Sequence, residues 1–195
     1  MIPGVIAVLL GYLLGSIPFG LLLTRAAGLG DIRAVGSGNI GATNVLRTGR
    51  KDVAAATLLL DGAKGVLAVF VIRYWAGNDP ALLAGVAAVI GHCTSPWVGF
   101  KGGKGVATAL GVVLAWAWPV GIACLLVWLA AAYLSKRSSV GSLTSMAASP
   151  VLLLLWAGPA AAVAGLVVAV IAFARHHENI ARLLAGTEPR IGQGR

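Results

Sequence analysis

The sequence predicts an all-α integral membrane protein, and three observations support that fold class. Hydrophobic residues make up 58% of the 195 residues and charged residues only 11%, with a mean hydropathy of +0.91. A soluble domain of this length could not tolerate so apolar a surface. The charge-free runs are long enough for one or two membrane crossings of about 20 residues each. The basic residues gather in a few loops between these runs.

The first three crossings follow from the charge-free runs. Residues 1–24 contain no charge and predict a first helix, residues 53–73 predict a second, and residues 80–96 predict a third. The second is interrupted only by Asp61 and Lys64. Because these two residues are spaced three apart, they can neutralise each other, and we favour a structural pair over a direct catalytic role.

Two longer runs each predict a pair of short helices. Residues 105–135 are uncharged and too long for one crossing, and the Trp116-Ala-Trp-Pro119 stretch near their middle favours an interfacial turn. Residues 138–174 are also uncharged and too long, with Gly158-Pro159 as the point of reversal. We therefore expect a bundle of about seven transmembrane helices that forms one domain over residues 1–195. Five crossings, with one long run shallow or re-entrant, are the main alternative.

The positions of Lys and Arg predict how this bundle is oriented. Seven crossings place four basic segments on one face, and the only basic residue on the opposite face is Arg73. Since basic loops remain in the cytoplasm, we expect the N-terminus outside and the C-terminus in the cytoplasm. The residues of the four basic segments are Arg25, Arg33, Arg47, Arg50, Lys51, Lys101, Lys104, Lys136, Arg137, Arg175, Arg182, Arg190 and Arg195.

Charge and cysteine usage exclude several classes of protein. The net charge of +9 comes from 15 Lys and Arg against 6 Asp and Glu, and cytoplasmic loops explain it better than a nucleic-acid partner does. Cys93 and Cys124 stand apart, without a CxxC pair or a Cys/His quartet. This spacing indicates neither a disulfide framework nor a zinc site, so we expect no metal site and no cofactor.

The first polar motif runs from Val35 to Arg47 and is rich in glycine. Backbone amides exposed by glycine, together with a forked guanidinium, suit a phosphate group. The motif also matches G-x-G-x-x-G, but no strand precedes it and no βαβ unit surrounds it, so a dinucleotide site is not indicated. A polar cytoplasmic turn is the alternative. The candidate phosphate-binding residues are Ser37, Gly38, Asn39, Gly41, Thr43, Asn44 and Arg47.

The second polar motif covers residues 99–105 and resembles a P-loop only superficially. Lys104 is followed by Gly105 and not by a hydroxyl residue for Mg²⁺, so ATP chemistry is not supported. The motif leads into a helix whose N-terminal amides and partial positive charge favour anions. Two lysines that merely reach the membrane surface are the alternative. The residues expected to bind a phosphate here are Lys101, Gly102, Gly103 and Lys104.

The third motif covers residues 174–184, where the last transmembrane helix is expected to leave the membrane. On a continuous helix His176 and Asn179 share a face, so we expect them to act together. A simple interfacial helix is the alternative, and Glu178 beside the two histidines is too little for a metal site. Ser142, near the start of the sixth predicted helix, is a further candidate, although membrane serines often only bond a backbone carbonyl.

Together these motifs resemble those of a known family. GSGNIGATNVLR at 36–47, GHCTSPWVGFKGGKGVATALG at 91–111 and RHHENIARLLAGTEPRI at 175–191 are similar to the motifs of the bacterial acyl-phosphate:glycerol-3-phosphate acyltransferases, the PlsY family. The resemblance spans nearly the whole chain. It implies transfer of a fatty acyl group from acyl-phosphate to the 1-hydroxyl of sn-glycerol 3-phosphate, which yields lysophosphatidic acid and phosphate for phospholipid biosynthesis. It also implies a multi-pass protein of the bacterial cytoplasmic (inner) membrane, with its active site on the cytoplasmic side.

The chemistry that this resemblance implies needs no covalent intermediate. An acyl-phosphate is a mixed anhydride and is already activated, and the sequence has no G-x-S-x-G elbow. We expect direct attack by the glycerol hydroxyl, whose proton passes to a phosphate oxygen of the substrate or to His176. Fixed hydrogen-bond donors would then stabilise the developing charge. The catalytic candidates are His176, Asn179, Ser142 and Lys104.

Two other classes of protein share some of these features. A small organic-anion transporter would also gather cations on glycine loops, but the two halves of the chain show no inverted repeat and the polar clusters lie on one face. A CDP-alcohol phosphotransferase would share the Asp61-Gly62 pair. The further aspartates that its metals need are missing from residues 65–78, so this class is rejected.

Overall fold

The computed structural model describes residues 2–192, and all regular structure in this part of the chain is helical. Met1 and residues 193–195, which include Arg195 of the predicted basic tail, lie outside the described residues. Short 3₁₀ turns occur at Ile32–Ala34, Leu46–Thr48 and Pro96–Val98. The α-helices are α1 (Ile2–Ser16), α2 (Phe19–Ala26), α3 (Ala42–Val45), α4 (Lys51–Ala76), α5 (Asn78–Cys93), α6 (Val106–Trp116), α7 (Trp118–Ser135), α8 (Ser138–Ala157), α9 (Pro159–Arg175) and α10 (His177–Leu184).

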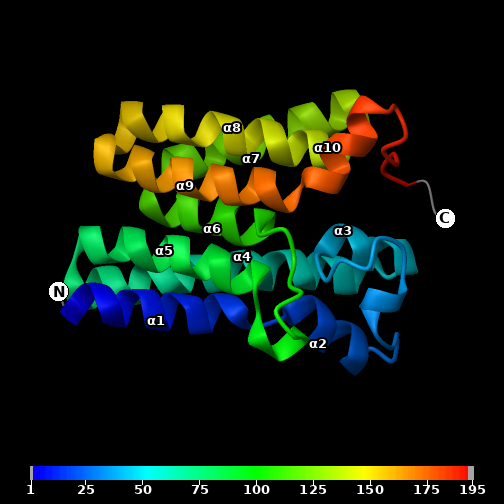
Figure 1. Cartoon of the computed structure of the whole chain (residues 1–195), viewed down its shortest axis with the longest axis horizontal. Coiled ribbons are helices and arrows are strands. Elements are labelled where there is room, and N and C mark those ends of the chain that lie inside the picture. Colours follow the sequence, from blue (N-terminus) through cyan, green and yellow to red (C-terminus); the bar gives the residue numbers. More distant parts are fainter. Residues whose placement is uncertain (1, 193–195) are drawn as a thin grey trace.

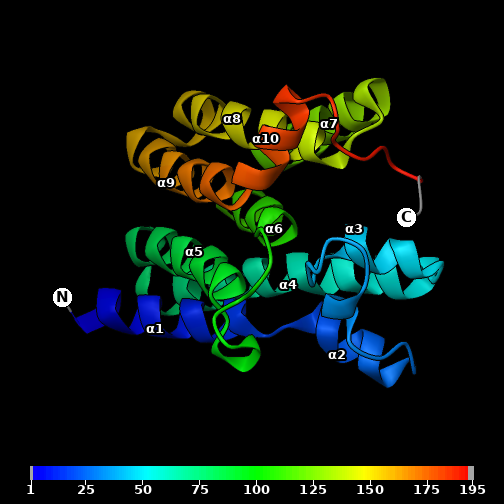
Figure 2. The same ribbon diagram turned by 45° about the vertical axis from the view of Figure 1, so that its right-hand side comes forward.

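The helices form two layers with α6 between them. Figure 1 shows α1, α4 and α5 in one layer and α7, α8 and α9 in the other, and the turned view in Figure 2 agrees. Helices α2, α3 and α10 lie toward the end of the bundle opposite the N-terminus (Figure 1). The loops that carry the first and third motifs therefore meet at one end of the molecule.

The apolar helices differ in length from what the sequence predicts. Among residues 2–192, five helical segments are long and apolar enough to cross a membrane, and the bent pair α9–α10 makes a sixth. Helix α6 has only 11 residues and falls short. By length and composition the count is thus five or six, against the seven expected. The predicted division of residues 105–135 and 138–174 into helix pairs is confirmed, with breaks at Ala117 and Gly158.

The first predicted helix, residues 1–24, is not continuous. Helix α1 ends and α2 begins around Pro18, because proline lacks the N–H that a helix interior needs and its ring clashes with the preceding turn. The segment Ile2–Ala26 still counts as one candidate crossing, as expected, but the helix within it is broken. The break also leaves the carbonyl of Ile17 accessible to Lys64, whose ammonium group donates a hydrogen bond to it at 2.6 Å.

Small residues allow α1 and α5 to approach closely. A Cβ at Gly11 would lie 2.3 Å from the carbonyl oxygen of Ala84, and a Cβ at Gly15 would lie 2.0 Å from that of Ala88. In lipid, helices associate through close packing of this kind because burial between them brings little hydrophobic gain. The spacing of Gly11 and Gly15, four residues apart, thus sets the contact between α1 and α5.

We expect Gly15→Val to destabilise the protein, because the new side chain would overlap the backbone of α5. Overpacking of a close contact costs about 1–3 kcal/mol. Thermal unfolding of the purified protein in detergent should show a lower midpoint than the wild type. Gly4→Val is the matched control, since a Cβ at Gly4 would meet only the end of Leu83 at 3.5 Å. Equal midpoints for the two variants would contradict this packing.

Helix α6 is held at its C-terminal end by Arg73. The Arg73 guanidinium comes from α4 and donates a hydrogen bond to the carbonyl of Ala115 at 2.7 Å. A cation is favourable there because the last carbonyls of a helix have no partners of their own and carry partial negative charge. Arg73 therefore fixes a short helix whose other end reaches the site described next.

Candidate functional site

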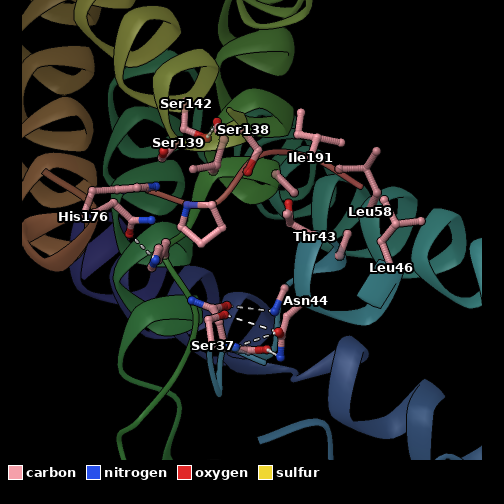
Figure 3. A pocket seen from close by; sticks show the side chains of 18 of the residues that line it. Ser37, Thr43, Asn44, Leu46, Leu58, Ser138, Ser139, Ser142, His176 and Ile191 are labelled. Atoms are coloured by element: carbon pink, nitrogen blue, oxygen red, sulfur yellow. Dashed lines mark hydrogen bonds between the residues drawn. The ribbon is translucent and has the colours of Figure 1, made fainter. Parts of the chain in front are cut away.

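A cavity of about 480 Å³ opens between the two layers. Figure 3 shows Ser138, Ser139 and Ser142 on one side of this pocket, Ser37 and Asn44 on the opposite side, and His176 between them. The pocket therefore joins segments that are far apart in the sequence. The candidates from the sequence that line it are Ser37, Asn39, Gly41, Thr43, Asn44, Arg47, Lys104, Ser142, His176 and Asn179.

Asn44 holds the first motif in shape. Its buried side-chain amide donates to the carbonyls of Ile32, Val35 and Asn39 at 3.1, 2.9 and 2.8 Å. Its oxygen accepts the backbone N–H of Ser37 at 3.1 Å. These bonds use the donors of Asn44 inside the loop. Its place in the structure is therefore to shape the loop, which differs from the expectation that it offers hydrogen bonds to a phosphate.

Gly36 allows Arg47 to lie across the first motif. Gly36 has φ of +55°, and a Cβ there would lie 2.6 Å from the side-chain oxygen of Asn44 and 2.8 Å from Arg47. The guanidinium of Arg47 donates to the same oxygen of Asn44 at 3.3 Å. Within residues 2–192, no carboxylate forms an ion pair with Arg47. Its positive charge is therefore available to an anion in the pocket.

A chain of polar contacts orients Asn179. The ammonium group of Lys104 donates to the side-chain oxygen of Asn179, and the amide nitrogen of Asn179 donates to Glu188 Oε1 at 2.5 Å. Arg182 Nε donates to the other carboxylate oxygen of Glu188 at 2.7 Å. Because both ends of the Asn179 amide have partners, its oxygen is aimed at Lys104 and its orientation is unambiguous.

His176 lies at a bend and not inside a continuous helix, which corrects the expectation for the third motif. The axes of α9 and α10 differ by 63°, and His176 joins them. His176 and Asn179 nevertheless both line the pocket. Because the carbonyl of Ala172 can only accept, His176 Nδ1 donates to it at 2.7 Å. In the neutral ring Nε2 is then the unprotonated nitrogen and can accept a proton.

Glu188 is a site residue that the sequence analysis did not single out. It lies in the tail after α10, so no helical spacing relates it to Asn179 or Arg182. Its one sequence signal is that it is the only Asp or Glu after Glu178. Burial raises the pKa of Glu188, but hydrogen bonds from Asn179 and Arg182 outweigh burial and hold that pKa below its usual range. Glu188 thus stays ionised and anchors Asn179.

The ionised state of Glu188 predicts a pH-dependent stability. Since its folded-state pKa is lowered, the carboxylate stabilises the fold above the ordinary pKa of about 4.3, and this contribution is lost as the pH falls through the lower folded-state value. We expect Glu188→Gln to lower the thermal midpoint at neutral pH, and the difference from wild type to narrow below about pH 4. Glu178→Gln, at a largely exposed carboxylate, is the control. A difference that does not change with pH would contradict this account.

Lys104 is a partly buried cation that lacks a full counter-charge. Burial lowers the pKa of Lys104, and Arg182 and Arg47 lower it further, while Glu188 offsets only part of this. An anion in the pocket would favour the charged form of Lys104. The start of α6 adds to the attraction, because Val106 and Ala107 line the pocket and the first amides of a helix have no partners within it.

The structure does not bring the whole second motif to the pocket. Lys101 is exposed and does not line the cavity, nor do Gly102 and Gly103, whose amides donate to carbonyls at the end of α5. The loop folds back onto α5, so Lys104 alone represents this motif in the pocket. Gly38 of the first motif also lies outside the lining. Of the residues expected to bind a phosphate in the second motif, only Lys104 therefore lines the pocket.

Ser142 has its hydroxyl occupied. It donates to the carbonyl of Ser138 at 2.9 Å and accepts a hydrogen bond from Trp128 Nε1 at 3.2 Å. The alternative stated for membrane serines, a bond to a backbone carbonyl, therefore applies here. In this arrangement Ser142 orients Trp128 at the pocket wall.

Large apolar side chains also line the pocket. A hydrocarbon chain can lie against them, while the cations in the same pocket suit an anionic head group. The fold and this pocket together define a helical integral membrane protein with a cation-rich site for an anionic, partly apolar ligand. These apolar residues are Leu58, Leu110, Leu125, Trp128 and Leu129.

The chain belongs to the glycerol-3-phosphate acyltransferase family, whose sequence model matches residues 5–186. It is 58% identical to the glycerol-3-phosphate acyltransferase of Paramagnetospirillum magneticum, over 98% of this chain and 96% of that protein. It is 61% identical to that of Ruegeria sp. (strain TM1040), over 94% of this chain and 91% of that protein. The resemblance inferred from the three motifs is therefore confirmed.

Solved structures of a related protein agree. The crystal structure of PlsY (YgiH), an integral membrane glycerol 3-phosphate acyltransferase, in its glycerol 3-phosphate form is 38% identical, with a TM-score of 0.91 over 97% of this chain and 96% of that chain. The lysophosphatidic acid form is 37% identical, with a TM-score of 0.89 over 97% and 95% of the two chains. The chain is thus a multi-pass integral membrane protein with this fold.

Proposed function

We propose that this chain transfers a fatty acyl group from acyl-phosphate to the 1-hydroxyl of sn-glycerol 3-phosphate, forming lysophosphatidic acid and inorganic phosphate. One observation carries the proposal: Arg47 and Lys104 line the same pocket as several large apolar side chains. Each substrate brings a phosphate of roughly two negative charges near neutral pH, by analogy with a phosphomonoester. Without cations these groups would repel each other. The glycerol 3-phosphate and lysophosphatidic acid forms of the PlsY structures support the acceptor and the product.

In the proposed reaction the glycerol oxygen attacks the acyl carbonyl carbon directly. A new carbon–oxygen bond forms there, and the bond from that carbon to the phosphate oxygen breaks. The hydroxyl proton passes to a phosphate oxygen of the substrate or to Nε2 of His176, because Nδ1 of this ring is engaged by Ala172. Alignment of the two bound substrates then supplies much of the rate.

The side chains around the pocket have distinct proposed roles. Lys104 and Asn179 stabilise the charge that develops on the departing phosphate, together with the first amides of α6. Arg47 offsets the second phosphate. Ser142 acts on the apolar lining of the pocket through Trp128. The loop residues Ser37, Asn39, Gly41 and Thr43 form the polar rim that receives glycerol 3-phosphate, and Asn44 holds that loop in shape.

A product assay tests this function. Purified protein in lipid vesicles receives acyl-phosphate and labelled glycerol 3-phosphate, and the lipid products are separated and counted. We expect lysophosphatidic acid from acyl-phosphate, with no loss of rate in the presence of a chelator, because a mixed anhydride needs no metal to activate it. Acyl-CoA and acyl carrier protein serve as alternative donors. Product formed only from one of these would overturn the proposed donor.

We also propose that the N-terminus faces outward and the C-terminus lies in the cytoplasm of a bacterial inner membrane. The basic residues of the loops and tail support this orientation. A cysteine placed at Asn78, the first residue of α5, should react with an impermeant maleimide in right-side-out vesicles. A cysteine at Lys136, between α7 and α8, should react only after permeabilisation. The reverse pattern would invert the topology.

A further inference from the structure

Asp61, Lys64 and His92 form a buried polar cluster beside the pocket, and none of them has a part in the reaction described above. Lys64 Nζ lies 2.7 Å from Asp61 Oδ1 and 2.9 Å from His92 Nδ1. Each residue is at most 3% exposed, and Asp61 and His92 line the pocket. Charges this deep are costly unless they are paired, so the two ions neutralise each other as a unit.

Lys64 joins three parts of the fold. It lies on α4, contacts His92 on α5, and donates to the carbonyl of Ile17 at the break between α1 and α2. A lysine ammonium has only donors, so it is His92 Nδ1 that accepts. In the neutral ring the proton then lies on Nε2, and the ring is held in one orientation.

His92 holds the glycine pair that precedes Lys104. A Cβ at Gly103 would lie 2.0 Å from His92 Nε2, so the ring packs directly against this glycine. The carbonyl of His92 accepts the N–H of Gly103 at 3.0 Å. From the other side, Arg175 donates to the carbonyls of Gly102 at 3.1 Å and Gly103 at 3.2 Å. The two glycines are thus clamped between α5 and the end of α9.

We propose that Asp61, Lys64 and His92 are positioning residues that fix the Gly102-Gly103 segment and thereby hold the ammonium group of Lys104 at Asn179. This inference rests on the proposed function, in which Lys104 binds substrate phosphate. Glycine alone does not fix a backbone, because it loses more conformational freedom on ordering than any other residue. Preorganisation by the cluster removes that cost before the substrate binds.

The proposal predicts a specific defect in His92→Ala. Without the ring, the amides of Gly102 and Gly103 should exchange with deuterium faster, as measured by mass spectrometry on peptides from the loop between α5 and α6. Initial rates should show kcat lowered about tenfold, while the KM for glycerol 3-phosphate changes less than about threefold, because Lys104 is displaced from the departing phosphate, whose charge it stabilises in the transition state. His92→Gln, whose amide reaches as far as Nε2, should restore kcat to within about threefold of wild type.

A matched variant separates positioning from stability. Leu153→Ala removes a fully buried side chain of α8 that does not line the pocket. It should lower the thermal midpoint, while the exchange of the α5–α6 loop and the kcat stay at wild-type values. If Leu153→Ala lowers kcat as much as His92→Ala does, or if His92→Ala changes neither loop exchange nor kcat, the positioning role is overturned.

A second route covers the case in which His92→Ala does not fold. The double variant Asp61→Asn with Lys64→Met removes both charges together and so leaves neither one buried and unpaired. It should show the same faster loop exchange and the same lowered kcat, and wild-type values would overturn the proposal. Loop exchange does not depend on turnover. A wild-type protein that makes no lysophosphatidic acid from acyl-phosphate would therefore contradict the proposed function. The exchange data would still test whether the cluster fixes the Gly102-Gly103 segment.

Discussion

Lys104→Ala is expected to lower kcat by about 10²–10³-fold, the usual effect of removing one charge-stabilising donor from an active site. Lys104 contacts Asn179 and lines the pocket, and within residues 2–192 it is the one lysine in the lining. An alanine leaves the departing phosphate without this cation. Initial rates of lysophosphatidic acid formation over a range of glycerol 3-phosphate concentrations measure the loss.

Two other lysines test whether position or charge matters. Lys51→Ala removes the same charge from the exposed start of α4 and should leave the rate unchanged. Lys101 lies three residues before Lys104 but outside the cavity. We therefore expect Lys101→Ala to lower the rate less than about fivefold, as for a long-range effect of surface charge. Equal losses at Lys101 and Lys104 would favour the interpretation from sequence, in which both lysines bind phosphate, over the structure.

Much of the helical arrangement could be predicted because it depends on length and hydropathy. Residues 105–135 and 138–174 exceed one crossing, and each contains a proline next to an aromatic or a glycine where a reversal is favourable. The break at Pro18 was missed because residues 1–24 are apolar on both sides of it, so hydropathy does not change there. The short length of α6 was likewise hidden inside a long apolar run.

The sequence identified some of the residues that line the pocket but not the direction in which each side chain points. Glycine and basic residues mark a loop that can bind phosphate, but they do not say which atoms face the ligand. Asn44 turns inward to shape its own loop, and Lys101 is exposed outside the cavity because the segment that follows it folds onto α5. Glu188 approaches Asn179 only through the path of the tail, which has no periodicity from which contacts can be inferred.

Asn179→Ala is expected to reduce turnover strongly while the protein remains folded. The Asn179 side chain is the one link between Lys104 and Glu188, so its removal frees the cation and leaves a buried carboxylate with one fewer donor. We expect a loss in kcat of about 10²–10³-fold. His177→Ala, two residues away and exposed outside the cavity, should retain wild-type activity and serves as the control.

The isosteric change Asn179→Asp sharpens this test. It keeps the shape of the side chain but places a carboxylate where an amide now donates to Glu188 at 2.5 Å, and like charges at that separation repel. The new charge would also neutralise Lys104, which then offers less to a phosphate. If size alone mattered, Asn179→Asp would be active. We expect it to be as impaired as Asn179→Ala, and near-normal rates for either variant would remove Asn179 from the reaction.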